Sequence, residues 1–346
     1  MFTSAMGSDI GRLIPKSDKK IDYFREWKLA VDGYNSLYSF LAAIRTESGD
    51  YLKDSRGRVT SHLSGLFYRN VNLLETFISP VYIFDGQPHW LKRAEIHHRA
   101  AVKEHAEEQR AKAVEAGDLA AARRYAAQTV HITSDILAGT KALLDAMGIP
   151  WLVAPSEGEA QAAFMAKTKI VDAVASQDFD SILFGAPLLV RNLTVAGKRR
   201  VNGHDIEAPQ ELVTLDSVLS SLGLTLEELI DVAILTGTDF NPEGFSGIGP
   251  KTALKLIKTN KKLENIAKIQ PELQKINYQM IRDMFLVPTL DTTVSLPPHK
   301  PVDEQAVIHI LVDEHGFSLE RITTALQRIN TAIQARSQSL DAWFSP

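Results

Sequence analysis

Residues 154–184 read APSEGEAQAAFMAKTKIVDAVASQDFDSILF and contain two pairs of carboxylates, each with one residue between its members. The first pair is Glu157 and Glu159, and the second is Asp178 and Asp180. Both pairs adjoin apolar runs. Carboxylates crowded in this way repel one another unless a hard cation compensates their charge. The stretch therefore predicts much of a magnesium site.

Apolar strands and amphipathic helices alternate on both sides of this stretch. Strands are predicted at residues 28–33, 81–86, 149–154, 171–176 and 188–193, and helices at 34–45, 61–77 and 134–147. This alternation is typical of an α/β fold with a mainly parallel, helix-flanked central sheet. Ligands of such sheets bind beyond the carboxyl ends of the strands.

Six acids fall at that edge of the predicted sheet, namely Asp32, Asp85, Glu157, Glu159, Asp178 and Asp180. Each has an ordinary alternative: an Asp-Gly pair is also a turn signal, and Ser156 with Glu159 fits a capping box. Six acids at one edge do not share such an explanation easily. A seventh candidate, Asp239, follows a helix predicted at residues 227–235, on which Asp231 is interpreted as a surface or capping charge.

Bulk composition excludes several other classes of protein. The chain of 346 residues has no cysteine, so disulfides, thiolate metal sites and cysteine nucleophiles are excluded and an intracellular location is expected. Neither a membrane span nor a signal peptide is predicted. The net charge of −4 is not typical of a nucleic-acid binder, but acids at a metal site and basic patches elsewhere would cancel in the sum.

Two segments outside the predicted sheet have the character of substrate-binding elements. Residues 90–132 form a polar helical pair with a break at 116–118, which is either a solvated hairpin or a device that grips substrate. Gly247 and Gly249 open a helix that carries Lys251 and four further lysines, a pattern that favours non-specific phosphate binding. The alternative there is a tight turn with a solvated lysine face.

The C-terminal end carries exposed-looking aromatic residues after a helical region predicted at residues 303–335. Leu340, Trp343 and Phe344 lie in a short polar tail. They are interpreted as an anchor for an apolar pocket of a partner, or alternatively as residues that pack on the chain's own core.

Several long motifs, in the same order, give the chain a resemblance to the flap endonucleases of DNA replication and repair, in particular those of archaea. They are VDGYNSLYSFLAAIR, TSHLSGLFYR, VYIFDGQP, APSEGEAQAA, SQDFDSILFGAP, LVRNLTVAGKR, ILTGTDFNP and GIGPKTAL. The resemblance covers almost all of residues 6–344. It implies a PIN-like 5′-nuclease fold with a helical arch over the active site and a helix–two-turn–helix element.

The resemblance also implies roles for individual residues. The metal ligands would be Asp32, Asp85, Glu157, Glu159, Asp178, Asp180 and Asp239, holding two Mg²⁺ ions for which Mn²⁺ could substitute. Lys92 and Arg99 would act on the scissile phosphate, together with the catalytic acids Asp178 and Asp180. DNA contacts would come from Gly7, Tyr38, Arg45, Arg69, Glu157, Gly237, Gly247, Gly249 and Lys251, with a K⁺ ion at the helix–two-turn–helix.

In domain terms, the family pattern implies one nuclease domain at residues 1–335. It would comprise an N-terminal part at 6–100, the arch at 90–132 and an internal part at 120–262, with the helix–two-turn–helix at 239–262. Residues 336–346 would form a tail that binds the sliding clamp (PCNA) through Leu340, Trp343 and Phe344. The chain departs from the family at Ser337, where Gln is usual, and at Gly7, which lies behind MFTSAM instead of at the processed N-terminus.

The function implied is a structure-specific 5′-flap endonuclease with 5′–3′ exonuclease activity. It would remove 5′ flaps during Okazaki fragment maturation and repair by two-metal-ion hydrolysis. The expected partners are branched double-stranded DNA with a 5′ flap and the sliding clamp, with no membrane. A monomer is expected, located in the cytoplasm if the organism is an archaeon. The alternative is a non-catalytic adaptor that binds DNA junctions or the clamp.

Overall fold

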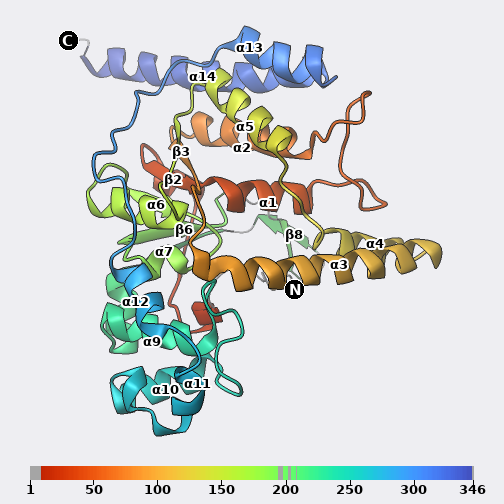
Figure 1. Ribbon diagram of the computed structural model, residues 1–346. Helices are drawn as coiled ribbons and strands as arrows, with labels where there is room; N and C mark the ends of the chain where they lie inside the picture. The colour runs from red at the N-terminus through yellow and green to blue at the C-terminus, as the bar shows by residue number, and fades with distance from the viewer. Residues whose placement is uncertain (1–8, 194–197, 202–203, 208, 345–346) are drawn as a thin grey trace.

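The computed structural model has a seven-stranded sheet with helices on both faces (Figure 1). The structure describes residues 9–193, 198–201, 204–207 and 209–344. The strands are β1 (Ser17–Lys19), β2 (Lys28–Asp32), β3 (Ser79–Phe84), β4 (Trp151–Val153), β5 (Ala173–Ala175), β6 (Leu188–Arg191) and β9 (Gln210–Thr214). Their order across the sheet is β1-β9-β6-β5-β2-β3-β4.

The central part of the sheet is parallel, which confirms the expectation from the alternating pattern. Strands β4, β3, β2, β5 and β6 all run in one direction, so that their carboxyl ends meet at a single edge. β9 runs antiparallel to β6 and carries the short edge strand β1. β7 (Lys198–Val201) and β8 (His204–Glu207) form a separate antiparallel hairpin.

Helices from both ends of the chain cover one face of the sheet. They are α1 (Gly33–Ala43), α2 (Ser61–Glu75), α5 (Ser134–Ala146), α13 (Glu304–Ile308) and α14 (Leu319–Phe344), with the π-helical turn η6 (His309–Glu314) before α14. Their apolar side chains pack together in one core, in which Phe67 of α2 and Tyr82 of β3 are fully buried. The N-terminal α1–α2 pair and the C-terminal α14 therefore share one hydrophobic core.

The opposite face is covered by helices from the middle of the chain. These are α6 (Gly158–Lys167), α7 (Asp180–Leu183), α8 (Leu215–Leu222), α9 (Leu226–Thr236) and α12 (Tyr278–Leu286), together with the short η1 (Asp9–Arg12). The short η2 (Ile21–Phe24) lies on the first face, where Phe24 joins the core that contains Phe67. α10 (Pro250–Asn260), η4 (Leu263–Asn265), η5 (Ala267–Ile269) and α11 (Gln270–Leu273) extend this layer into a lobe below the sheet (Figure 1).

Asp231 of α9 is buried in that lobe, so its interpretation as a surface charge was wrong, although it does cap a helical turn by accepting from the Leu263 amide of η4 at 3.3 Å. Only 1% of its surface is exposed, and its two carboxylate oxygens accept hydrogen bonds of 2.8 and 2.9 Å from Arg282 of α12. Arg282 also donates to Glu264 of η4 at 3.0 Å. A buried charge is tolerable when it is paired and hydrogen-bonded, and this network joins three segments of the lobe.

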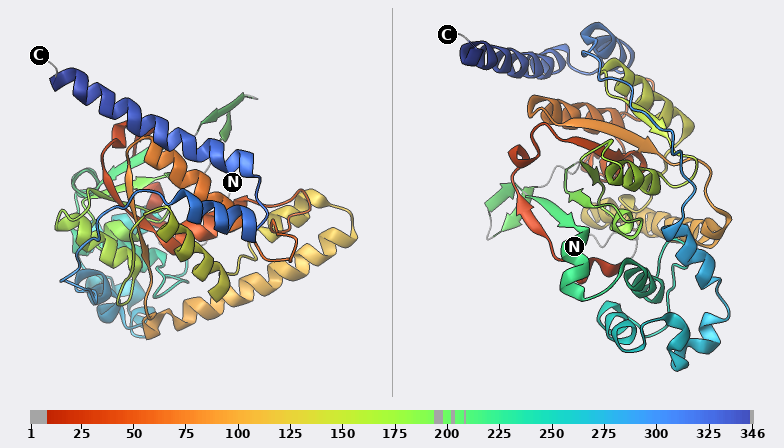
Figure 2. Two further views of the ribbon diagram at one scale, coloured as in Figure 1. Left: turned by 90° about the horizontal axis from the view of Figure 1, so that it is seen from above. Right: turned by 90° about the vertical axis from the view of Figure 1, so that its left-hand side faces the viewer.

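The predicted polar helical pair is present as α3 (Arg93–Glu115) and α4 (Leu119–Ala126), which project from the body of the molecule (Figures 1 and 2). The break between them has a local cause. Gly117 has a φ of +71°, which favours glycine, and the Asp118 side chain caps α4 by accepting from the Ala121 amide at 2.9 Å. Arg110 of α3 pairs with Asp50 at 2.5 Å, which ties the hairpin to the α1–α2 loop.

Among the helices of the described residues, none combines the length and the apolar character needed to cross a bilayer.

Candidate active site

Two of the predicted acids cap helices at the carboxyl edge of the sheet. Asp32 is the last residue of β2 and accepts from the Asn35 amide of α1 at 3.0 Å. Asp85 directly follows β3 and accepts from the Gly158 amide of α6 at 2.6 Å. β2 and β3 are parallel neighbours, so the two carboxylates come from adjacent strand ends. The predicted strand-end placement is therefore observed for both residues.

The predicted capping box of Ser156 and Glu159 was wrong. The N-cap residue of α6 is Glu157, and its side chain makes no capping hydrogen bond. The Ser156 hydroxyl instead donates to the Gln87 carbonyl at 3.3 Å. Asp85, which follows strand β3, accepts from the first amide of α6. A side chain distant in sequence therefore caps this helix in place of Ser156. The box was therefore not needed for the helix, and Glu157 and Glu159 are not engaged in it.

Asn35 and Ser176 link the acids of two strands, and neither residue was predicted as part of the site. The Asn35 side-chain amide donates to Asp178 at 2.7 Å, while its backbone amide donates to Asp32. Ser176 donates to Asp32 at 3.4 Å and accepts from the Asp178 amide at 3.2 Å. The sequence does contain a signal for both residues, because Asn35 lies three residues after Asp32 and Ser176 lies two residues before Asp178. A polar residue so close to a strand-end acid is a candidate for orienting it.

Lys92 brings a positive charge into the cluster of acids. It ends the short helical turn η3 (Trp90–Lys92), and its ammonium group forms ion pairs with Glu157 and, at 3.1 Å, with Asp239. Burial alone would lower the pKa of Lys92, but the nearby Asp239, Glu157 and Asp85 raise it above its usual value. Lys92 is therefore charged in the structure and balances carboxylates from α6 and from the turn after α9.

Burial and neighbouring charges disfavour the ionised forms of two further acids, Asp32 and Glu159. Burial, together with the nearby Asp85, raises the pKa of Asp32 to about 7. Burial and then the charges of Asp180, Asp32 and Asp178 raise the pKa of Glu159 well above its usual value. Several carboxylates at one desolvated edge therefore oppose one another's ionisation.

These residues fit a divalent cation by their chemistry. One carboxylate oxygen of Glu159, Oε1, is buried and has no hydrogen-bond partner, and an orphaned buried acceptor is costly. Carboxylate oxygens are the ligands that Mg²⁺ prefers. As they stand, the acidic and histidine side chains of the described residues form no ready group of three around one point. The Lys92 ammonium instead pairs with Glu157 and Asp239, so an ion that takes these two carboxylates must displace it.

The other predicted phosphate and DNA contacts lie at varied depths. Arg99 is within α3, Tyr38 is half-buried on α1, and Arg69 is half-buried on α2. Arg45 is buried, donating to the Leu41 and Gly49 carbonyls at 2.8 Å each and lying over the Tyr51 ring at 4.2 Å. In this arrangement Arg45 holds the α1–α2 loop, and its guanidinium is not displayed on the surface.

Gly7 lies outside the described residues. The backbone of α14 continues as a helix through the predicted clamp anchors Leu340, Trp343 and Phe344.

The glycine turn before α10 has an open, positively charged face. Gly247 has a φ of +73°, and a Cβ at Gly247 or Gly249 would meet no atom within 4 Å. Lys251 is exposed, as are the further lysines Lys255, Lys258, Lys261 and Lys262. Gly237, at the end of α9, has a φ of +108°, and a Cβ there would lie 2.8 Å from the Pro242 carbonyl oxygen. Backbone amides at the start of α10 are therefore accessible to an anion.

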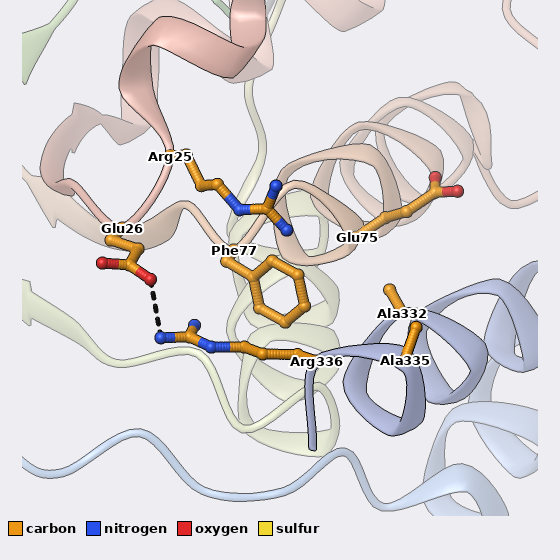
Figure 3. Close-up of a pocket in the computed structure, with 7 residues that line it drawn as sticks. All are labelled: Arg25, Glu26, Glu75, Phe77, Ala332, Ala335 and Arg336. Atoms are coloured by element: carbon orange, nitrogen blue, oxygen red, sulfur yellow. Dashed lines mark hydrogen bonds and ion pairs between the residues drawn. The ribbon is translucent and has the colours of Figure 1, made fainter. Parts of the chain in front are cut away.

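A cavity of about 420 Å³ lies at the opposite edge of the sheet (Figure 3). In it, the ring of Phe77 lies between the guanidinium groups of Arg25 and Arg336, at 4.9 and 4.8 Å. Arg336 also pairs with Glu26 at 2.6 Å. Arg25 and Phe77 precede β2 and β3, whereas the acids follow these strands, so the cavity is separate from the acid cluster.

Comparison with known proteins gives concordant matches along the chain. Residues 12–106 match the XPG N-terminal domain and residues 148–239 match the XPG I-region. The chain is 46% identical to flap endonuclease 1 of Thermococcus onnurineus, over 98% of this chain and 99% of the relative. It is equally 46% identical to flap endonuclease 1 of Staphylothermus marinus, over 98% of this chain and 100% of the relative. The solved structure of flap endonuclease-1 from Methanococcus jannaschii matches with a TM-score of 0.74 and 36% identity, over 95% of this chain and 100% of that one.

Proposed function

Because this chain belongs to the flap endonuclease family, we propose that its acid cluster is a two-metal site that hydrolyses branched DNA at 5′ flaps. The observation that carries the proposal is the convergence of carboxylates from four separate segments on one edge of the sheet, with an orphaned oxygen on Glu159. A protein that only binds DNA gains nothing from acids that face phosphates. The chain is accordingly a structure-specific nuclease and not a non-catalytic adaptor.

We assign Asp178 and Asp180 to one Mg²⁺ ion and Asp32 and Asp85 to the other, with Glu157 and Glu159 between them and Asp239 completing the set. Mn²⁺ has the same preference for oxygen ligands and should substitute. When bound, such ions supply an activated water and stabilise the attacking and leaving oxygens of an in-line displacement. Asn35 and Ser176 keep Asp32 and Asp178 oriented from behind through the hydrogen bonds described above.

Lys92 and Arg99 are proposed to act on the scissile phosphate. They are seven residues apart, about two helical turns, at the start of the projecting hairpin. The ammonium of Lys92 already lies among the acids, so a small displacement would bring it to a phosphate held there. A positive charge at that point offsets the negative charge that develops on the phosphate in the transition state.

Substrate choice is proposed to rest on DNA shape and not on base sequence. The exposed lysines of α10 and the open amides at its start suit the phosphates of a duplex. A K⁺ ion could bridge the glycine turn before α10 and the DNA backbone. The α3–α4 hairpin begins directly after Lys92, which pairs with Glu157 and Asp239, so a free 5′ strand could pass beside the acid cluster under the hairpin. Flap cleavage in replication and repair, together with 5′–3′ exonuclease activity, would follow from this arrangement. The C-terminal tail with Leu340, Trp343 and Phe344 is proposed to bind the sliding clamp.

The metal-site proposal is tested by replacing Asp178 with alanine and assaying a 5′-flap substrate in Mg²⁺. Cleavage should fall by about a hundredfold or more, because a displaced ion mispositions the reacting groups, while duplex binding is retained. The matched control is Asp216→Ala, at an exposed acid on α8. If Asp178→Ala cleaves at near the wild-type rate, Asp178 is not a ligand of a catalytic ion. Flap, nick and bubble substrates in the same assay define the junction preference.

A further inference from the structure

Trp90 is an exposed aromatic residue beside the acid cluster. It begins η3, and 52% of its surface is accessible to solvent. Its two successors point inward: Leu91 packs against the core below the sheet, and Lys92 forms ion pairs with Glu157 and Asp239. The same turn therefore buries an apolar side chain, places a cation among the acids and leaves a large indole in water.

The imidazole of His89 packs against the exposed indole of Trp90. The two ring centroids are 5.6 Å apart, with an interplanar angle of 37°. His89 is itself fixed, because its Nδ1 accepts from the Leu91 amide at 3.3 Å and its carbonyl accepts from the Lys92 amide at 2.9 Å. Trp90 and His89 thus form a paired aromatic surface whose orientation is set by the turn that also places Lys92.

The loop that carries this pair is firmly attached to the active-site edge. The Gly86 amide donates to the Ser156 carbonyl at 2.7 Å, and the Ser156 hydroxyl donates to Gln87. A Cβ at Gly86 would lie 2.1 Å from the Ala154 carbonyl oxygen, so the loop approaches the β4–α6 connection as closely as a backbone can. Little conformational entropy remains to be lost when a ligand packs on Trp90.

We propose that Trp90 is a positioning residue that stacks on an unpaired nucleobase of the cut strand, within about two nucleotides of the scissile phosphate. This inference rests on the proposed function. The Cα atoms of Trp90 and Lys92 are at most about 7 Å apart, so the indole lies within the reach of two side chains from the phosphate that Lys92 would contact. Every base has a π-face, so stacking on Trp90 would hold an unpaired nucleotide without reading its identity.

Stacking on an aromatic side chain strengthens binding of single-stranded nucleic acid by about tenfold per base. Trp90→Ala should therefore raise the KM for a 5′-flap substrate by about tenfold, with a smaller effect on kcat in single-turnover assays. Trp90→Phe retains an aromatic face and should recover most of the loss. Tyr23→Ala is the matched control, because Tyr23 is an aromatic residue with 50% exposure that precedes β2, at the other edge of the sheet.

The decisive experiment removes the base instead of the side chain. Four substrates each carry one abasic nucleotide, at the first or second position on either side of the cut. On one of them, wild type and Trp90→Ala should have the same KM. If the defect of Trp90→Ala persists on every abasic substrate, or if Trp90→Ala matches wild type on the intact flap, the stacking role is overturned.

A binding measurement separates this inference from the proposed function. 2-Aminopurine at the sensitive position should lose fluorescence when wild type binds in Ca²⁺, and much less when Trp90→Ala binds. The quenching needs no cleavage, so it reports stacking even if the wild-type protein failed to cut flaps. An unquenched probe on a wild-type protein that cuts flaps overturns the role of Trp90 and leaves the nuclease function standing.

Discussion

Lys92 forms ion pairs with two carboxylates that are also proposed as metal ligands. Its side chain is 17% exposed, and its ammonium lies between Glu157, at the N-terminus of α6, and Asp239, after α9. The raised pKa of Lys92, caused by Asp239, Glu157 and Asp85 against the effect of burial, keeps it charged at any working pH. A tethered cation in this place competes with a divalent ion for the same carboxylates. It also stabilises the cluster before an ion arrives.

The first prediction concerns that competition. Lys92→Met should bind its first Mn²⁺ ion about tenfold more tightly, the equivalent of about 1.4 kcal/mol, because the competing ammonium is gone. In chelator the same variant should be less stable by about 3 kcal/mol, since breaking a buried ion pair leaves its carboxylates uncompensated. Free Mn²⁺ measured by electron paramagnetic resonance gives the affinity, and urea unfolding gives the stability. Lys258→Met, at an exposed lysine of α10, is the control, and an unchanged or weaker affinity in Lys92→Met would contradict the competition.

Packing between α2 and α5 determines the protonation state of His62. His62, near the start of α2, is 3% exposed, and its Nδ1 has no hydrogen-bond partner. A Cβ at Gly139 of α5 would lie 3.5 Å from its ring, so a small residue there lets the two helices approach. Burial, with a smaller contribution from His315, lowers the pKa of His62 to about 4. The imidazole is therefore neutral in the folded chain.

The second prediction follows from the sign of that shift. Above about pH 6.5 the imidazole is neutral in both the folded and unfolded chain, so it has no effect. Between pH 6.5 and 4 the unfolded chain binds a proton that the folded chain does not, so stability falls as pH falls, by about 3 kcal/mol in all. His62→Gln should lack this part of the acid destabilisation. Urea unfolding at pH 7.5 and 4.5 measures it against His105→Gln, an exposed histidine of α3; equal acid losses in all three proteins would contradict it.

At the level of elements, the sequence predicted the sheet and the strand-end acids well because both follow from short-range patterns. Buried parallel strands read as apolar runs, and their carboxyl ends meet wherever the sheet is parallel, as at Asp32 and Asp85. Which distant side chain would cap a helix or pair with a given acid could not be predicted from the local sequence. Asp85 displaced Ser156 as the cap of α6, and Arg282, 51 residues away along the chain, drew Asp231 into the interior. The same limit hid Asn35 and Ser176, whose hydrogen bonds cross between strands.

Over the whole molecule, the site acids and the exposed lysines of α10 lie in different regions, so a net charge of −4 is compatible with the proposed binding of DNA. The acids gather at the carboxyl edge of the sheet, and the exposed lysines of α10 lie in the lobe below it (Figure 1). The C-terminal end of α14 extends from the opposite side, above the sheet. A partner held at that end need not approach the acids or the lobe that carries α10.

The last prediction uses this separation. Deleting residues 337–346 should leave cleavage of free flaps within about twofold of wild type, because the deletion removes none of the acids, Lys92 or α10. It should abolish stimulation by the sliding clamp, whose apolar pocket would lose Leu340, Trp343 and Phe344 as anchors. Ser337→Gln, which restores the family's usual residue, should instead tighten clamp binding several-fold by adding side-chain hydrogen bonds. Titration calorimetry with the clamp and flap cleavage at sub-KM substrate measure both effects, and undiminished stimulation of the truncated chain would place the clamp contact elsewhere on the protein.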